Sequence, residues 1–169
     1  GFTHLLDLHG NLRSLLIRRL AGVENVQVYR KDALARRLFV AFGLDSPALQ
    51  KHTVERYLAA LEAWGISSTD RSIQLGDYKG RKEEQGATNG PQRVLVLQSA
   101  FLGDCLLTLP LLRDLKALLP DCRVTVLTLE KTAEIFRGSP WVDEVLVDDK
   151  RGAHGGLRGP WLLAKSLRG

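Results

Sequence analysis

The 169-residue sequence contains no methionine, only two cysteines and no long apolar run. Two cysteines are too few for a disulfide framework or a cysteine-based metal site, and their apolar neighbours favour plain packing in a reducing compartment. Every apolar run is shorter than the roughly 18 residues that span a bilayer, and the N-terminus lacks a secretory signal pattern. Because residue 1 is not methionine, we expect a processed, excised or engineered piece rather than a complete open reading frame.

The composition is otherwise that of a globular protein, with 44% hydrophobic and 25% charged residues. The net charge of +5 and the pI of about 9.5 favour anionic partners, such as phosphates, carboxylates, nucleic acid or acidic lipid headgroups. Nucleic acid is the weakest of these, because the sequence lacks the interleaved aromatic and basic residues that form stacking platforms. We therefore expect no nucleic-acid partner.

The second half of the chain alternates buried strands and helices. Strands are expected at three short segments rich in Val and Leu: 93–98, 123–129 and 144–149. Helices are expected between and after them, over 106–119, 131–137 and 156–168, with a kink or a restart at Pro110. Nearly continuous apolar strands are typical of a parallel sheet that is covered on both faces.

The first half repeats this alternation. It predicts strands over 3–9 and 24–30, and helices over 11–22, 32–43 and 53–65. Residues 66–92 are rich in Gly, Ser, Lys and Glu, which is typical of a mobile linker. The sequence therefore predicts a single α/β domain over 1–169, a Rossmann-like three-layer sandwich with a parallel sheet, made of 1–65, the linker 66–92, and 93–169.

The order of the elements is unusual for such a fold. If the last residues are placed before the first, they form a helix, a glycine turn and a buried strand, which is an ordinary connection. The chain breaks this connection and joins its other two ends through the linker. Because domain termini often lie close together, such a rearrangement is tolerated. We therefore expect a circular permutation, in which 93–169 originally preceded 1–65.

Four segments carry a resemblance to a known family. They are VLVLQSAFLGDCLLTLPLLRDLK (94–116), SPWVDEVLVDDKRG (139–152), LLDLHGNLRS (5–14) and HTVERYLAALEAWG (52–65). In permuted order, these segments resemble the N-terminal domain of the glycosyltransferase family 9 heptosyltransferases, bacterial enzymes of lipopolysaccharide core assembly. The resemblance implies the N-terminal half of a two-domain GT-B fold. In the family, the second domain, which holds the nucleotide sugar, would follow Gly65, and we expect this chain to lack it.

The resemblance implies an acceptor-binding domain that is inactive without this nucleotide-sugar domain. The implied partner is an anionic lipopolysaccharide-core acceptor, and the implied location is the cytoplasm with at most peripheral contact with the inner membrane. No cofactor or metal is expected, since SAFLGD (99–104) lacks the G-x-G-x-x-G fingerprint of dinucleotide sites. The alternative is a non-catalytic scaffold, an excised or engineered permuted Rossmann-like fold.

Asp104 is the candidate catalytic residue. It follows Gly103 after the first strand of the second half, where open α/β sheets bind ligands. From the residues alone, Asp104 is also a good helix N-cap. The resemblance places it on the family's general base, which takes the proton from the attacking acceptor hydroxyl.

Six residues are candidates for binding the acceptor: Ser99, Gly103, His9, Arg13, Lys150 and Arg151. Ser99 and the amides of 101–104 could bind an anion at a helix N-terminus. Arg13 could hold a phosphate or carboxylate with two parallel bonds, and Lys150 and Arg151 add positive charge at the same edge of the sheet. Gln98 and Ala100 depart from the family, which commonly has Lys or Arg and Ser at these positions.

Overall fold

The computed structural model describes residues 1–29, 39–43, 52–66 and 91–168. A parallel five-stranded sheet forms its centre, in the order β2-β1-β3-β4-β5. Its strands are β1 (His4–Asp7), β2 (Asn25–Val28), β3 (Arg93–Leu97), β4 (Arg123–Thr128) and β5 (Glu144–Val147). The predicted α/β fold with a parallel sheet is confirmed, and each predicted strand is present.

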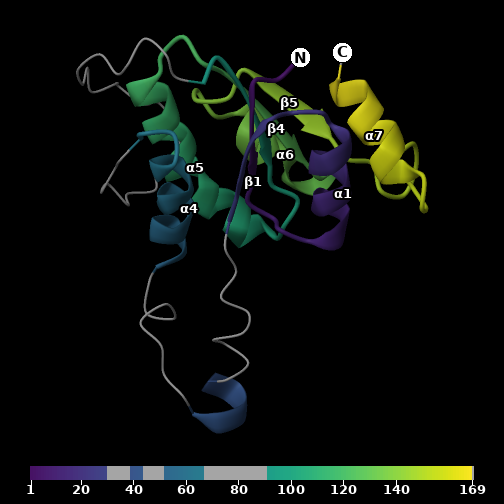
Figure 1. Ribbon diagram of the computed structural model, residues 1–169, viewed down its shortest axis with the longest axis horizontal. Coiled ribbons are helices and arrows are strands. Elements are labelled where there is room, and N and C mark those ends of the chain that lie inside the picture. Colours follow the sequence, from purple (N-terminus) through teal and green to yellow (C-terminus); the bar gives the residue numbers. More distant parts are fainter. Residues whose placement is uncertain (30–38, 44–51, 67–90, 169) are drawn as a thin grey trace.

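Helices cover both faces of this sheet (Figure 1). One face carries α1 (Leu12–Leu20) and α7 (Gly159–Leu167), and the other carries α4 (Thr53–Glu62), α5 (Leu102–Leu118) and α6 (Glu130–Arg137). The helix predicted over 32–43 lies outside the described residues except for its last five positions. Among the helices that the structure describes, none has both the length and the apolar character needed to cross a bilayer.

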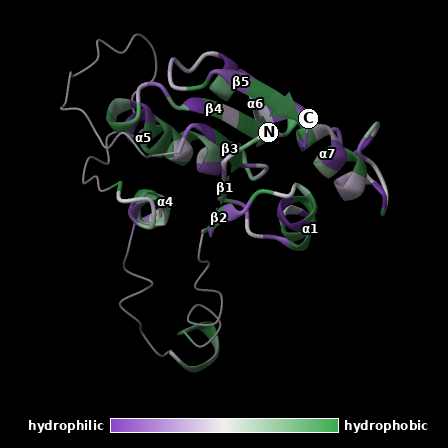
Figure 2. Cartoon of the chain, turned by 45° about the horizontal axis from the view of Figure 1, so that its top comes forward, coloured by the Kyte–Doolittle hydropathy of each residue, from purple (hydrophilic) through white to green (hydrophobic). Residues whose placement is uncertain are grey.

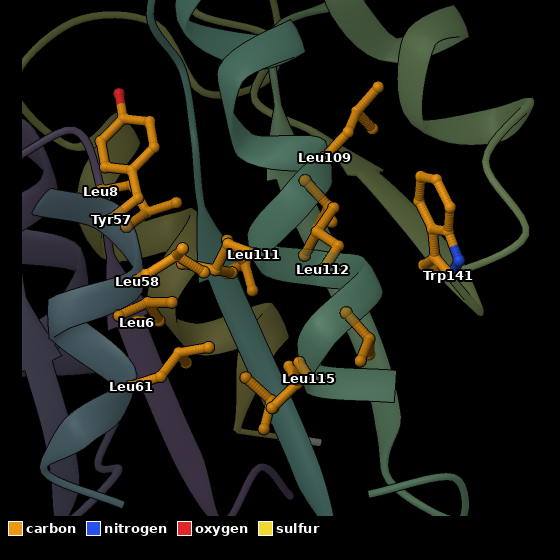
Figure 3. Packing of buried hydrophobic residues seen from close by; sticks show 14 of the residues in the cluster. Leu6, Leu8, Tyr57, Leu58, Leu61, Leu109, Leu111, Leu112, Leu115 and Trp141 are labelled. Atoms are coloured by element: carbon orange, nitrogen blue, oxygen red, sulfur yellow. The ribbon is translucent and has the colours of Figure 1, made fainter. Parts of the chain in front are cut away.

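Alternating strand residues divide the core into two apolar clusters. In β3, Val94 and Val96 contribute to the cluster under α4, α5 and α6, while Leu95 and Leu97 contribute to the cluster under α1 and α7. This follows from the strand period of two, which directs successive side chains to opposite faces. Figure 3 shows the larger cluster, where leucines of α4 and α5 meet those of the sheet. Figure 2 colours the same layers by hydropathy, and the helices carry both apolar and polar residues.

Helix α5 passes through Pro110 without restarting. Of the two outcomes predicted at this residue, a kink or a restart, the restart does not occur, and the kink stays a prediction. A proline inside a helix costs about 3 kcal/mol, because it removes one hydrogen bond and crowds the preceding turn. Residues 108–115 are all buried, so packing on every side of α5 offsets this cost.

Residues at both margins of the predicted linker 66–92 pack against the domain. Ile66 is only 5% exposed and packs in the larger cluster, and its amide donates to the carbonyl of Leu61. Pro91 is buried at the other end. Composition alone does not show that an isolated apolar residue such as Ile66 packs against a distant core. Residues 67–90, on which the prediction of mobility falls, lie outside the described residues.

The two ends of the chain lie next to each other. A Cβ atom built on Gly1 would be 3.7 Å from the carbonyl oxygen of Arg168, and the guanidinium Nε of Arg168 donates to the carbonyl of Leu20 at 2.7 Å. Helix α7 therefore ends where β1 begins (Figure 1). This is the arrangement that an uninterrupted α7–β1 connection would require.

Both cysteine thiols are buried, and we therefore expect the protein to lose stability at alkaline pH. Burial raises the pKa of Cys105, and raises that of Cys122 from the ordinary value of 9.0 to about 11. The unfolded chain then loses protons before the folded chain does. The free energy of unfolding should therefore be intact below pH 9 and fall as the pH approaches 11, with Cys122 contributing about 1–2 kcal/mol.

Denaturant unfolding between pH 8 and pH 11 under reducing conditions measures this effect. The decline should be smaller in Cys122→Ala than in the unaltered chain. Identical declines in the two proteins would contradict it. Other groups that titrate in this pH range are present in both proteins, so their contribution to the decline cancels in the difference.

Candidate functional site

The chain changes direction across the sheet between β1 and β3. From β1 the chain proceeds outward to β2, and from β3 it proceeds the other way through β4 to β5. Asp7 and Leu97, the last residues of β1 and β3, lie opposite each other in the ladder. Ligands of open α/β sheets bind at such a point, beyond the carboxyl ends of the strands.

The predicted site residues lie at this carboxyl edge. His9 follows β1, and Ser99 to Asp104 follow β3, so both segments flank the point where the direction changes. Lys150 and Arg151 follow β5, at the same edge but beyond β4. Parallel strands impose this common edge, since all of their carboxyl ends point the same way.

Asp104 lies inside the first turn of α5 rather than at its cap. The N-cap residue is Phe101, which makes no side-chain capping bond within the described structure, so Asp104 is the third helical residue. The N-cap alternative for Asp104 is therefore wrong. A carboxylate in a first turn interacts favourably with the positive end of the helix dipole. The Asp104 side chain is half-buried, while Gly103 beside it is exposed, and a Cβ there would meet no described atom within 4 Å.

A buried amide holds this first turn in place. The side chain of Gln98 is fully buried, and its Nε2 donates to Oγ1 of Thr108 at 2.8 Å and lies 3.4 Å from the carbonyl oxygen of Asp104. The Thr108 hydroxyl donates to the same carbonyl at 2.9 Å. Gln98, noted in the sequence as a departure from the family, thus fixes the backbone that carries the Asp104 carboxylate.

Two tyrosines form the wall beside Gln98. The rings of Tyr29 and Tyr57 meet edge to face with centroids 5.0 Å apart, and the Tyr57 hydroxyl lies 3.5 Å from the Gln98 amide nitrogen. Burial, together with the nearby Asp104 charge, raises the pKa of Tyr57 to about 12, against the opposing effect of the Gln98 hydrogen bond. The hydroxyl is therefore neutral at physiological pH. Nothing local in the sequence connects Tyr57 with Asp104, because the two residues lie on separate helices.

The turn after β1 is organised by a buried carboxylate. Asp7 has no exposed surface, and one of its oxygens accepts hydrogen bonds from the amides of His9 and Gly10, at 3.1 and 2.8 Å. Its other oxygen accepts from the Ser14 hydroxyl at 2.7 Å and from the Arg18 guanidinium at 3.2 Å. Gly10 has a φ of +53°, which a glycine adopts without strain. These contacts make the turn rigid and leave Asp7 a structural role.

Arg13 joins the turn after β1 to the end of β5. Its Nε and Nη2 donate to the two carboxylate oxygens of Asp148 at 2.8 and 2.7 Å, and Nη2 also donates to the carbonyl of His154. The Asp148 side chain is only 2% exposed. An acceptor anion would have to compete with Asp148 for these donors, so Arg13 as an acceptor ligand stays a prediction. The sequence did not identify Asp148, because nothing local pairs two residues 135 positions apart.

Lys150 adds positive charge beside this ion pair. Burial lowers its pKa, and the charges of Arg13 and Lys131 lower it further, while Asp148 acts in the opposite direction. Arg151 is exposed next to it. The cations at this edge thus repel one another, and a bound anion would relieve that repulsion.

No protein-family model, curated protein or solved structure matches this chain. The resemblance to the family 9 heptosyltransferases therefore depends on the four sequence segments alone. In the part of the chain that the structure describes, no three His, Cys, Asp or Glu side chains are grouped to hold a metal ion. The chemistry available at the carboxyl edge is that of one half-buried carboxylate, a buried amide, a neutral phenol and a group of cations.

Proposed function

We propose that this chain is the acceptor-binding domain of a heptosyltransferase-like glycosyltransferase of lipopolysaccharide core biosynthesis. The observation that supports the proposal is the position of Asp104, in the first turn of the helix after β3 and beside the point where the chain changes direction. Gln98 and Thr108 hold the backbone carbonyl of Asp104, and a carboxylate on this fixed turn can act on a ligand that lies beyond the strand ends.

In the proposed reaction, the Asp104 carboxylate accepts the proton of the attacking acceptor hydroxyl. The acceptor oxygen forms a bond to the anomeric carbon of the donor sugar, and the bond from this carbon to the nucleotide phosphate breaks with inversion. Lys150 and Arg151 supply charge for an anionic acceptor. The separate donor domain would have to hold the nucleotide sugar against the acceptor, and without it we expect no turnover.

The proposal includes a circular permutation of the GT-B N-terminal half. In the unpermuted order, β3 would be the first strand, and α7 would lead directly into β1. The contact between Gly1 and Arg168 supports this order, because the two ends lie close enough for a short connection.

A non-catalytic scaffold is the second candidate. This candidate is favoured because two polar groups at the carboxyl edge are already bound by other residues of the chain. Asp7 is bound by two amides of its own turn and by two side chains of α1, and Arg13 is bound by Asp148. A scaffold with no ligand would require nothing more of these residues.

Titration with a phosphorylated, acidic core-sugar acceptor separates the two candidates. Amide chemical shifts should change at 9–14, 99–104 and 150–152 and remain constant elsewhere. Lys150→Gln combined with Arg151→Gln should weaken acceptor affinity about fivefold, since exposed ion pairs contribute up to about 1 kcal/mol. Arg123→Gln, an exposed arginine at the opposite edge of the sheet, is the matched control and should leave affinity unchanged. An absence of shift changes in the unaltered chain would favour the scaffold.

A further inference from the structure

The helices α1 and α7 carry basic residues and no acidic ones. Residues 11–22 and 150–169 contain no aspartate or glutamate. Their basic residues are Arg13, Arg18, Arg19, Lys150, Arg151, Arg158, Lys165 and Arg168. Asp7 and Asp148, beside the layer that these helices form, are buried and paired with Arg18 and Arg13, while the exposed Glu24 and Asp149 lie just outside these two ranges. The opposite layer is mixed, since the exposed Arg137 of α6 is paired with Glu130 and Glu134.

The same layer exposes large apolar side chains. They are Leu12 (73% exposed), Leu16 (41%), Leu157 (100%), Trp161 (52%) and Leu162 (44%). Isolated apolar residues are common on protein surfaces, but a group of this kind marks a site of interaction. We call the exposed side of α1 and α7, with Leu157 and Arg158, the α1/α7 face.

Helical spacing directs these side chains away from the sheet. In α1, Ser14 and Ile17 are buried, so Leu12, Leu16 and Arg19 lie along the opposite side at spacings of four and three. In α7, Leu163, Ala164 and Leu167 are buried. Trp161, Leu162 and Lys165 remain on its outer side. The two helices pack side by side over one face of the sheet (Figures 1 and 2).

Trp161 and Lys165 have the combination found at lipid–water boundaries. The Lys165 ammonium lies 5.6 Å from the centroid of the Trp161 ring. A tryptophan ring of this kind is apolar over its faces and polar at one edge, and a lysine extends its charge from an apolar stem. Leu157 and Leu162 supply apolar side chains beside them.

We propose that the α1/α7 face docks on the surface of an anionic lipid bilayer. Arg19, Arg158 and Lys165 attract the headgroups, while Leu12, Trp161 and their apolar neighbours enter the boundary between headgroups and acyl chains. Helices lying along the interface in this way do not span the membrane. Nucleic acid fits this face less well, because its phosphates would cover exposed leucines without giving them an apolar partner. The proposal holds whether or not Asp104 acts in glycosyl transfer.

Sedimentation with vesicles tests this proposal on the full chain. The probes are vesicles of phosphatidylglycerol and phosphatidylcholine in equal parts, and vesicles of phosphatidylcholine alone. The chain should bind the anionic vesicles, release them as salt is raised, and bind the neutral vesicles at least tenfold more weakly. Arg158→Glu combined with Lys165→Glu should lower affinity by about thirtyfold or more, because each of the two basic residues near an anionic surface contributes about 1 kcal/mol.

Arg137→Glu is the matched control, since this arginine is exposed on α6 in the opposite layer. It should bind vesicles as the unaltered chain does. Equal losses in Arg137→Glu and in the α7 variant would overturn the proposal, as would equal binding to the two kinds of vesicle. Binding to duplex DNA in the absence of binding to anionic vesicles would also overturn it.

Tryptophan fluorescence gives a second measurement that does not depend on the folding of the charge variant. Trp161 is 52% exposed, whereas Trp141 is 5% exposed and Trp64 is partly buried. Anionic vesicles should shift the emission of the chain to shorter wavelength, and Trp161→Phe should abolish this shift. A shift that persists in Trp161→Phe would overturn insertion of the α1/α7 face.

Discussion

Replacing Asp104 with asparagine should lower glycosyl transfer by about 10²–10⁴-fold when the nucleotide-sugar domain is supplied in trans or by fusion. This is the usual contribution of a general base, and the amide has no basic oxygen with which to accept the acceptor's proton. Asparagine preserves the shape of the side chain at the third position of α5. The Gln98 and Thr108 contacts with the residue 104 carbonyl also remain, because they involve the backbone.

The affinity for acceptor separates a catalytic role from a structural one. Asp104→Asn should change the transfer rate at saturating acceptor and leave the acceptor dissociation constant nearly unchanged. Asp121→Asn is the matched control, an exposed aspartate beyond the other end of α5, and it should transfer at the unaltered rate. Unchanged transfer in Asp104→Asn would refute the catalytic role and leave the ancestry of the fold open.

Replacing Asp7 with alanine should lower the free energy of unfolding by about 3 kcal/mol or more. The substitution removes a fully buried carboxylate that accepts four hydrogen bonds, and it leaves the Arg18 guanidinium and the Ser14 hydroxyl without this partner. Breaking a buried ion pair by removing one member costs about 3–5 kcal/mol. We expect the lower end, since 22% of the Arg18 side chain is exposed and water can replace part of the interaction.

Denaturant unfolding followed by circular dichroism measures this loss. Asp149→Ala is the matched control, because the Asp149 carboxylate also accepts amide hydrogen bonds, from Gly152 and Ala153, but is exposed to solvent. Its substitution should have a distinctly smaller effect on the midpoint of unfolding. Equal shifts of the two midpoints would show that burial of Asp7 does not determine its contribution.

The sequence by itself determined the layers of this protein. Short Val- and Leu-rich segments and helical spacing between them predict each strand and the helices that separate them, because period and burial are local properties of the chain. They also place His9, Ser99, Asp104 and Lys150 at one edge of the sheet, since parallel strands bring their carboxyl ends together. The adjacency of the two termini follows from the same alternation of elements.

Boundaries and helix positions were less well predicted. Asp104 proved to lie within the first turn of α5, and Pro110 did not interrupt this helix. In both places local propensity indicated an end or a break, but side-chain hydrogen bonds and burial decided the outcome. Gln98 and Thr108 hold the first turn of α5, and burial along 108–115 stabilises the helix through its proline.

Only the tertiary structure decided which polar groups face inward and which remain exposed. Arg13 has the sequence context of an anion ligand, yet its guanidinium binds Asp148 from the far end of the chain. Trp161 and Leu162 belong to an apolar stretch of the sequence, yet they lie on the outer side of α7. The reason is physical: periodicity sets the spacing of residues along one element, whereas the partner of each side chain depends on which elements the fold brings beside it.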